Sequence, residues 1–169
     1  MADVFVAIMM GSESDLPVMR ASMDVLEQFS IRYEVRITSA HRTPKDTQDF
    51  VRDAELRGCQ VFVAAAGTAA HLAGAVAAQT VKPVIGVPID AGSLQGIDAL
   101  LSTVQMPGGI PVACVAIGKA GAKNAAYLAV QIMAVEDEAL AAKLSAERAD
   151  NATKIRASNQ AVNQNLESQ

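Results

Sequence analysis

The chain has 169 residues and a formal net charge of −4, with a pI of about 5.1 and no run of basic residues. These features argue against a nucleic-acid-binding scaffold, and no apolar run approaches the roughly 18 residues that cross a membrane. Hydrophobic residues make up 51% of the chain but aromatic residues only 4%, so the predicted core depends on Ala, Val, Ile, Leu and Met.

The cysteines and the first residues indicate the cellular compartment. Cys59 and Cys114 stand alone in apolar segments, which is more typical of reduced thiols in the cytoplasm than of a disulfide or a metal pair. Met1–Val4 leads directly into an apolar run and leaves no room for a signal peptide. We therefore predict a cytoplasmic protein with no membrane or nucleic-acid partner.

Five short apolar or alternating stretches, each followed by a helical pattern, run in series along the chain. The predicted strands are Val4–Met10, Tyr33–Thr38, Gln60–Ala65, Pro83–Val87 and Val112–Ile117. The predicted helices span about Val18–Phe29, Lys45–Arg57, Ala66–Gln79, Gly96–Val104 and Gly118–Met133. Because strands of the buried type alternate with helices, the pattern predicts an α/β fold with a doubly wound, five-stranded parallel sheet in one domain over residues 1–135.

The remaining residues, 136–169, differ in composition. From Glu136 to about Arg156 they are charged and Ala-rich, with good helix propensity and few large apolar side chains. One interpretation is a frayed surface helix that ends in a disordered polar stretch, Asn159–Gln169. The other is a helical extension that packs on a neighbouring subunit, and the Ala- and Gly-rich chain favours this oligomeric reading.

The connection after the second predicted strand, Ser39–Pro44, is the first candidate site. Thr43 is a plausible helix N-cap and Pro44 suits the first helical position, so the segment is a strand-to-helix turn. Such turns build the ligand crevice of open parallel sheets. His41 is suited to moving a proton near neutral pH, and Arg42 adds a fixed cation. The alternative is a surface histidine beside an ordinary helix cap.

The connection after the first predicted strand, Gly11–Asp15, has the composition of an anion site. Ser12 and Ser14 bring hydroxyls to a helix N-terminus, which favours an anion, and Asp15 can accept hydrogen bonds from ribose hydroxyls. The combination predicts a sugar-phosphate ligand, with plain N-capping as the alternative. No Walker or Gly-x-Gly-x-x-Gly motif supports binding of ATP or a dinucleotide.

The third connection is almost free of side chains and ends in a second histidine. Small residues there predict a dry pocket wall, with His71 at the helix start, either in the pocket or as a helix cap; the residues expected to line the wall are Ala65, Ala66, Gly67 and Ala70. Gly86–Pro88 and Ser102–Gly109 could cover the same crevice. Because the two histidines have no Cys or carboxylate at ligand spacing, we expect no metal, and no covalent nucleophile is evident.

Several motifs in this order resemble those of the PurE family, class I. The resemblance covers about residues 4–135 and rests on Gly11–Asp15, Ser39–Pro44, Ala69–Leu72, Leu101–Pro107 and Ala116–Ala122. Three positions depart from the family pattern: Thr68 stands where Gly is common, Ala73 where Pro is usual and Ala91 where Ser is common. These departures bear on local loop shape.

The resemblance implies a flavodoxin-like three-layer α/β/α sandwich, a homo-octamer and no cofactor. It implies that Ser12, Asp15 and Arg42 bind a ribonucleotide and that His41 is the proton carrier. We expect the remaining substrate contacts from Ser14, Ser39, Ala40, Ala66, Gly67, His71 and Leu72.

The class I resemblance also implies a reaction: conversion of N5-carboxyaminoimidazole ribonucleotide to 4-carboxy-5-aminoimidazole ribonucleotide in de novo purine biosynthesis. Arg42 and His71 favour class I over class II relatives, which carboxylate aminoimidazole ribonucleotide with free CO2. That carboxylase and a non-catalytic sugar-phosphate-binding domain are the alternative functions.

Overall fold

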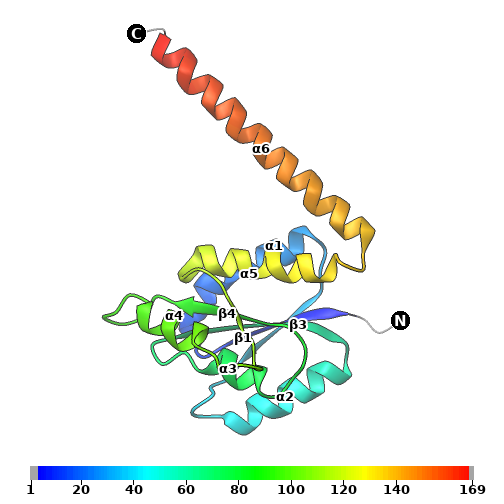
Figure 1. The fold of residues 1–169 in the computed structure, drawn as a ribbon, viewed down its shortest axis with the longest axis vertical. Coiled ribbons are helices and arrows are strands. Elements are labelled where there is room, and N and C mark those ends of the chain that lie inside the picture. The colour runs from blue at the N-terminus through cyan, green and yellow to red at the C-terminus, as the bar shows by residue number, and fades with distance from the viewer. Residues whose placement is uncertain (1–3, 168–169) are drawn as a thin grey trace. The chain divides into compact units, whose positions relative to one another are not determined.

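The structure is a computed structural model that describes residues 4–167. The chain divides between Ile132 and Met133 into two compact units. The first unit is a three-layer sandwich: α1 (Leu16–Gln28) and α5 (Gly118–Met133) cover one face of a sheet, and α2 (Pro44–Leu56), α3 (Leu72–Ala77) and α4 (Ile97–Val104) cover the other (Figure 1). The predicted flavodoxin-like α/β fold is confirmed.

All five strands of the sheet are parallel. They are β1 (Phe5–Met10), β2 (Tyr33–Ile37), β3 (Cys59–Gly67), β4 (Val84–Ile89) and β5 (Ala113–Cys114). Their spatial order is β2-β1-β3-β4-β5, so the direction of winding reverses between β1 and β3. In open sheets of this kind the ligand crevice forms at the carboxyl ends of the strands, at that reversal.

The central strands form the core. Every residue of β1 and β4 is buried, as is most of β3, because helices cover both faces of the sheet. The edge strands differ from the buried type that we expected: Val35 and Ile37 of β2 are 43% and 51% exposed, and β5 contains only two residues. An edge strand has a neighbour on one side only, so its burial depends on loops and partners rather than on the sheet.

The third helix is shorter than predicted. Ala66 and Gly67 extend β3, Thr68 adopts a left-handed backbone conformation with φ of 53°, and α3 runs only from Leu72 to Ala77. A positive φ cannot continue an α-helix, so the predicted start at Ala66 is wrong.

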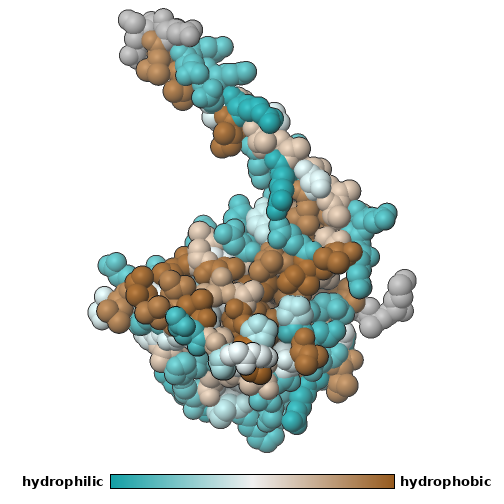
Figure 2. All heavy atoms as spheres, viewed as in Figure 1, coloured by the Kyte–Doolittle hydropathy of each residue, from teal (hydrophilic) through white to brown (hydrophobic). Residues whose placement is uncertain are grey.

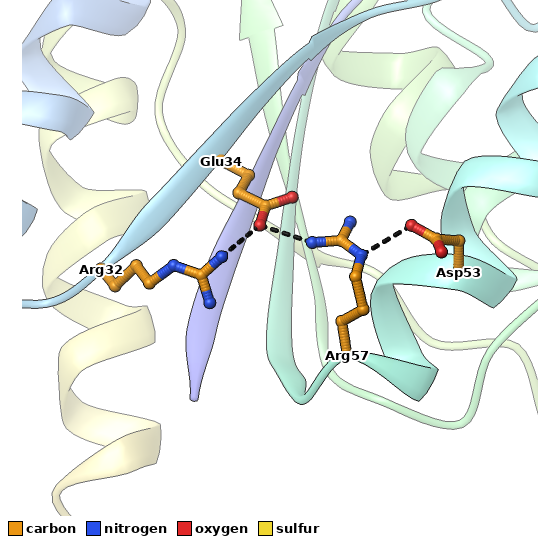
Figure 3. Close-up of polar contacts among 4 residues, drawn as sticks. All are labelled: Arg32, Glu34, Asp53 and Arg57. Atoms are coloured by element: carbon orange, nitrogen blue, oxygen red, sulfur yellow. Dashed lines mark hydrogen bonds and ion pairs between the residues drawn. The ribbon is translucent and has the colours of Figure 1, made fainter. Parts of the chain in front are cut away.

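A cluster of charged and aromatic side chains lies at the amino-terminal ends of the strands. One carboxylate oxygen of Glu34 accepts hydrogen bonds from Arg32 and Arg57, and Arg57 also donates to Asp53 at 2.7 Å (Figure 3). The guanidinium carbons of both arginines lie over the ring of buried Phe5, at 4.9 and 5.2 Å from its centroid. Cation–π contacts and ion pairs thus join β1, β2 and α2 at the edge opposite the carboxyl ends of the strands.

The second unit contains one long helix, α6 (Glu138–Glu167). The predicted disordered stretch from Asn159 is helical up to Glu167, so that part of the prediction is wrong; residues 168–169 lie outside the described residues, as do residues 1–3 of the predicted entry into the first strand. Within residues 4–167, no helix combines the length and apolar character needed to cross a membrane.

Candidate active site

A pocket of about 260 Å³ opens at the carboxyl ends of the strands, where the sheet reverses direction. The connections after β1, β2, β3 and β4 all contribute to its wall. The lining residues are Gly11, Ser12, Ser14, Asp15, Ser39, Ala40, His41, Arg42, Ala66, Gly67, Thr68, Ala69, His71, Leu72 and Ala91. The fold therefore brings His41 and the ten predicted substrate-contact residues to one cavity, while the roles assigned to them stay predictions.

The connection after β1 folds back on itself. The Ser12 hydroxyl accepts a hydrogen bond from the Ser14 amide at 3.3 Å, and the Ser12 amide donates to the Asp15 carboxylate at 3.2 Å, which completes a capping box. Ser12 thus acts as the N-cap of a short 3-10 helix, η1 (Glu13–Asp15), which precedes α1; this agrees with the alternative interpretation, and Ser12 still lines the pocket. The Asp15 side chain is held at the pocket wall by its own loop.

Asp15 is a buried carboxyl, with only 5% of the residue exposed. Burial raises the pKa of the Asp15 carboxyl above its usual range, and hydrogen bonds from Ser12 and Ser14 offset this effect only in part. An ionised Asp15 is therefore less stable in the folded chain than in the unfolded chain, where water surrounds it.

Asp15→Asn is expected to raise the free energy of unfolding at pH 7. The folded carboxyl binds its proton more tightly than the unfolded one, so the parent chain loses stability as pH rises from the unfolded pKa through the folded pKa. An amide does not ionise and can still accept the Ser12 amide hydrogen bond. The gain should therefore be present at pH 7 and shrink as pH is lowered toward about 4, near the unfolded pKa.

Thermal unfolding of both proteins at several pH values measures this difference. Asp24→Asn, which changes an exposed carboxylate on α1, is the matched control and should show no comparable pH-dependent gain. An Asp15→Asn chain that is less stable than the parent at pH 7 would contradict the argument.

The connection after β2 is fixed by hydroxyl groups. The Ser39 hydroxyl accepts hydrogen bonds from the backbone amides of His41 and Arg42, at 3.3 and 3.2 Å. Thr43 occupies the N-cap position of α2, but its hydroxyl accepts from the Ser39 amide at 2.9 Å instead of capping the helix. Pro44 is the first residue of α2, as predicted. These bonds set the backbone from which His41 and Arg42 project.

Two histidines from different connections meet in the pocket. His41 Nε2 and His71 Nδ1 are 2.7 Å apart, and the two rings are nearly perpendicular, with an interplanar angle of 84°. His71 occupies the N-cap position of α3, as the alternative interpretation held, but its side chain makes no capping hydrogen bond and contacts His41 instead. Sequence reasoning placed both residues at the crevice but did not foresee their direct contact.

The wall after β3 consists of small residues, although not all of those predicted. Ala66, Gly67 and Ala69 line the pocket, whereas Ala65 and Ala70 are buried in the core. Ala65 is a buried residue inside β3, one position before the strand end that lines the pocket, and Ala70 lies beyond the strand in the connection to α3.

The two segments that we expected to cover the crevice do not contribute to the pocket. Within the described residues, neither Gly86–Pro88 nor Ser102–Gly109 lines the pocket. Ala91, which sequence analysis did not assign to the site, does line it. Ala91 could have been assigned to the site from its position just after a central strand. The connections that follow parallel strands all emerge at the same edge of the sheet.

One free cation and one acid determine the electrostatics of the pocket. The Arg42 side chain is exposed and forms no ion pair within residues 4–167, so its guanidinium is available to an anionic ligand. Asp15 is the acidic residue on the wall. No group of three or more His, Cys, Asp and Glu residues in the described part of the chain could hold a metal ion.

The comparisons with known proteins agree on one family. The model of a family described as AIR carboxylase matches residues 5–154. An N5-carboxyaminoimidazole ribonucleotide mutase from Pyrococcus abyssi is 53% identical over 145 residues, 86% of this chain and 82% of that protein. The mutase of the same name from Synechocystis is 55% identical over 82% of this chain and 78% of its own length. A crystal structure of Treponema denticola PurE, 32% identical, superposes with a TM-score of 0.82 over 90% of this chain and 94% of that chain.

Proposed function

This chain belongs to the AIR carboxylase family, and we propose on that basis that it converts N5-carboxyaminoimidazole ribonucleotide to 4-carboxy-5-aminoimidazole ribonucleotide. It is an isomerase of de novo purine biosynthesis, as the resemblance to PurE proteins implied. The observation that supports this best is a pocket in which a histidine pair lies beside a free arginine, a buried acid and a wall of small residues.

The roles within the pocket follow from the chemistry of each group. Arg42 and Ser12 bind the phosphate, because a guanidinium and a hydroxyl at a helix N-terminus both favour an anion. Asp15 accepts hydrogen bonds from the ribose hydroxyls. Ser14, Ser39, Ala40, Ala66, Gly67, His71 and Leu72 complete the surface around the base, and His41 carries the proton.

The reaction needs a positioned proton carrier and retention of CO2. Protonated His41 gives its proton to the exocyclic nitrogen, the bond between that nitrogen and the carboxyl carbon breaks, and CO2 is released next to an electron-rich ring. Carbon C4 attacks the CO2, and His41 takes the C4 proton, which returns it to its starting state. A small pocket keeps CO2 close to C4, so the rate gain comes from proximity and from exclusion of water. The proposed reaction uses no cofactor.

The two alternatives differ in where the carbon comes from. A carboxylase of the same family would start from aminoimidazole ribonucleotide and take CO2 from solution, and a non-catalytic sugar-phosphate domain would bind without turnover. The names of the relatives at 53–55% identity favour the mutase.

Incubating the chain with unlabelled N5-carboxyaminoimidazole ribonucleotide in ¹³C-bicarbonate buffer is expected to give an early product with little label. The substrate's own carboxyl carbon stays in the pocket between the two steps. Mass spectrometry of the product over the first turnovers measures the label. Product that carries the isotopic ratio of the buffer from the start would overturn the retention of CO2 and favour the carboxylase.

We propose further that residues 1–135 form the catalytic domain of a homo-octamer. An apolar stripe on and before α4 supports contact between subunits: Leu94, Ile97, Leu101 and Val104 are each 46–59% exposed and follow one helical face. Figure 2 shows hydrophobic residues gathered over this helix. A stripe of this size is costly to leave in water, so a second copy of the domain is its natural cover.

We propose that residues 136–169 pack on a neighbouring subunit. The large apolar residues of α6 are spaced by eleven residues or a multiple of eleven. Leu144, Ile155 and Leu166 follow one another at intervals of eleven, and Leu140 and Val162 lie twice that interval apart. Eleven residues are close to three helical turns, so these side chains form one stripe along the helix. Ile155, Val162 and Leu166 are 57–71% exposed, which leaves much of that stripe available to a partner.

Deleting the chain after about Glu136 is expected to lower the oligomeric state measured by light scattering. In the full-length chain, replacing Ile155, Val162 and Leu166 together with serine should have the same effect, because it removes the stripe and retains the helix. An unchanged assembly in both variants would favour the interpretation as a free surface helix.

We also place the protein in the cytoplasm. Cys59 and Cys114 are both free thiols, which is typical of a reducing compartment.

A further inference from the structure

The contact between the two histidines is specific about which atoms are engaged. It joins Nε2 of His41 to Nδ1 of His71 at 2.7 Å, within ordinary hydrogen-bond distance. Within residues 4–167, Nδ1 of His41 and Nε2 of His71 have no hydrogen-bond partner. Each ring of the pair therefore has one nitrogen without a hydrogen bond. The other two nitrogens, Nε2 of His41 and Nδ1 of His71, are hydrogen-bonded to each other.

A hydrogen bond between two imidazoles needs one N–H and one lone pair. If His41 donates, both rings have their proton on Nε2, which is the more common tautomer of a neutral imidazole. If His71 donated, both rings would adopt the less common Nδ1–H form. We therefore assign the donor as His41 Nε2–H and the acceptor as the lone pair on His71 Nδ1.

We propose that His71 is the positioning residue of His41, which fixes its tautomer and leaves Nδ1 of His41 as the nitrogen that exchanges the proton with substrate. This inference rests on the proposed function. When His41 is protonated, it has N–H groups on both nitrogens; the Nδ1 proton goes to the exocyclic nitrogen of the substrate, and Nδ1 later takes the proton from C4. The Nε2 proton stays in the hydrogen bond to His71 throughout, so protons balance over the cycle.

The partner of His41 is a neutral acceptor, which fits an anionic ligand. In the Ser-His-Asp triad a carboxylate fixes the tautomer of the histidine and stabilises its protonated form. A carboxylate beside His41 would repel both the phosphate and the carboxyl group of the substrate. A neutral imidazole accepts the same hydrogen bond without adding negative charge. The charged residues that line the pocket around the pair are Asp15 and Arg42, and neither is hydrogen-bonded to either ring.

Two substitutions at His71 separate this role from simple pocket lining. Asparagine places its amide oxygen close to the position of Nδ1 and can accept the hydrogen bond, whereas leucine fills the same volume without an acceptor. In His71→Leu we expect kcat to fall by about 10- to 100-fold with little change in KM, because the orientation of His41 is lost while leucine still fills the wall beside the base and Arg42, Ser12 and Asp15 still hold the phosphate and ribose. His71→Asn should retain at least tenfold more of kcat than His71→Leu.

The tautomer is measured directly by ¹⁵N NMR of the ligand-free protein. We expect His41 to be locked as Nε2–H in the parent chain and in His71→Asn, and to become a mixture in His71→Leu. A His41 tautomer that does not change in His71→Leu, or an increase in KM with kcat unchanged, would overturn the proposal, the latter in favour of direct substrate binding by His71. The NMR result does not depend on the reaction, so a parent chain that shows the lock but does not turn over N5-carboxyaminoimidazole ribonucleotide would overturn the proposed function instead.

Discussion

His41→Asn is expected to reduce turnover of N5-carboxyaminoimidazole ribonucleotide by about 10²- to 10⁴-fold, the range typical of removing a general acid–base group. Asparagine cannot carry a proton at neutral pH, and this reaction needs one proton moved twice. The His41 side chain is exposed at the pocket wall, so the fold should be unaffected. Binding of the ribonucleotide should change little, because its phosphate and ribose are held by Arg42, Ser12 and Asp15 in the proposed arrangement.

Single-turnover kinetics and calorimetric titration with the ribonucleotide product measure the two quantities separately. Lys45→Ala, on the exposed side of the adjacent helix and outside the pocket lining, is the matched control and should retain the parent rate. A His41→Asn chain with a near-normal rate would end the assignment of His41 as proton carrier. A chain that had lost binding as well would show that His41 holds the substrate.

Gly121→Ala is expected to abolish folding or to destabilise the chain by more than about 4 kcal/mol. A Cβ atom at Gly121 would overlap the backbone carbonyl oxygen of Ala116, far inside van der Waals contact. Gly121 is buried in the first turns of α5, and the clash is with main chain, which cannot move aside as a flexible side chain would. The clash could be relieved only if α5 moved away from the backbone at Ala116.

Soluble yield and urea unfolding measure this effect. Gly108→Ala is the matched control: no atom lies within 4 Å of a Cβ built there, and its backbone is not left-handed, so stability should change by less than about 0.5 kcal/mol. A Gly121→Ala chain as stable as the parent would show that the close approach of α5 to Ala116 is not required.

The sequence predicted the central part of the fold because burial leaves a strong pattern. β1 and β3 could be recognised as strands from their apolar sequences alone. Both lie at the centre of the sheet, where they are neighbours. The extent of β5 could not be predicted: its apolar sequence suits a longer strand, but only Ala113 and Cys114 pair with β4. Hydrophobicity indicates that a segment tends to be buried, not how long it stays in register with its neighbour.

Most residues of the candidate site could be predicted from the sequence, but their geometry could not. Parallel strands bring their carboxyl ends to one edge, so the connections after β1, β2 and β3 had to be close. The pairing of His41 with His71 needed more, because β2 and β3 are not neighbours: β1 lies between them. The two connections reach each other across the end of β1, and no local pattern encodes that reach.

The cluster of Arg32, Glu34, Arg57 and Phe5 has a consequence for how this chain can change over evolutionary time. It ties together the edge of the sheet farthest from the pocket. The pocket edge contains features that oppose stability, among them a buried acid and a β-branched residue in a left-handed conformation. A protein can tolerate such features only while its other contacts keep it above the threshold for folding. The distant cluster therefore contributes stability that offsets the cost of these features. Weakening it should make the chain less tolerant of new substitutions around the ligand, although none of the residues of the cluster lines the pocket.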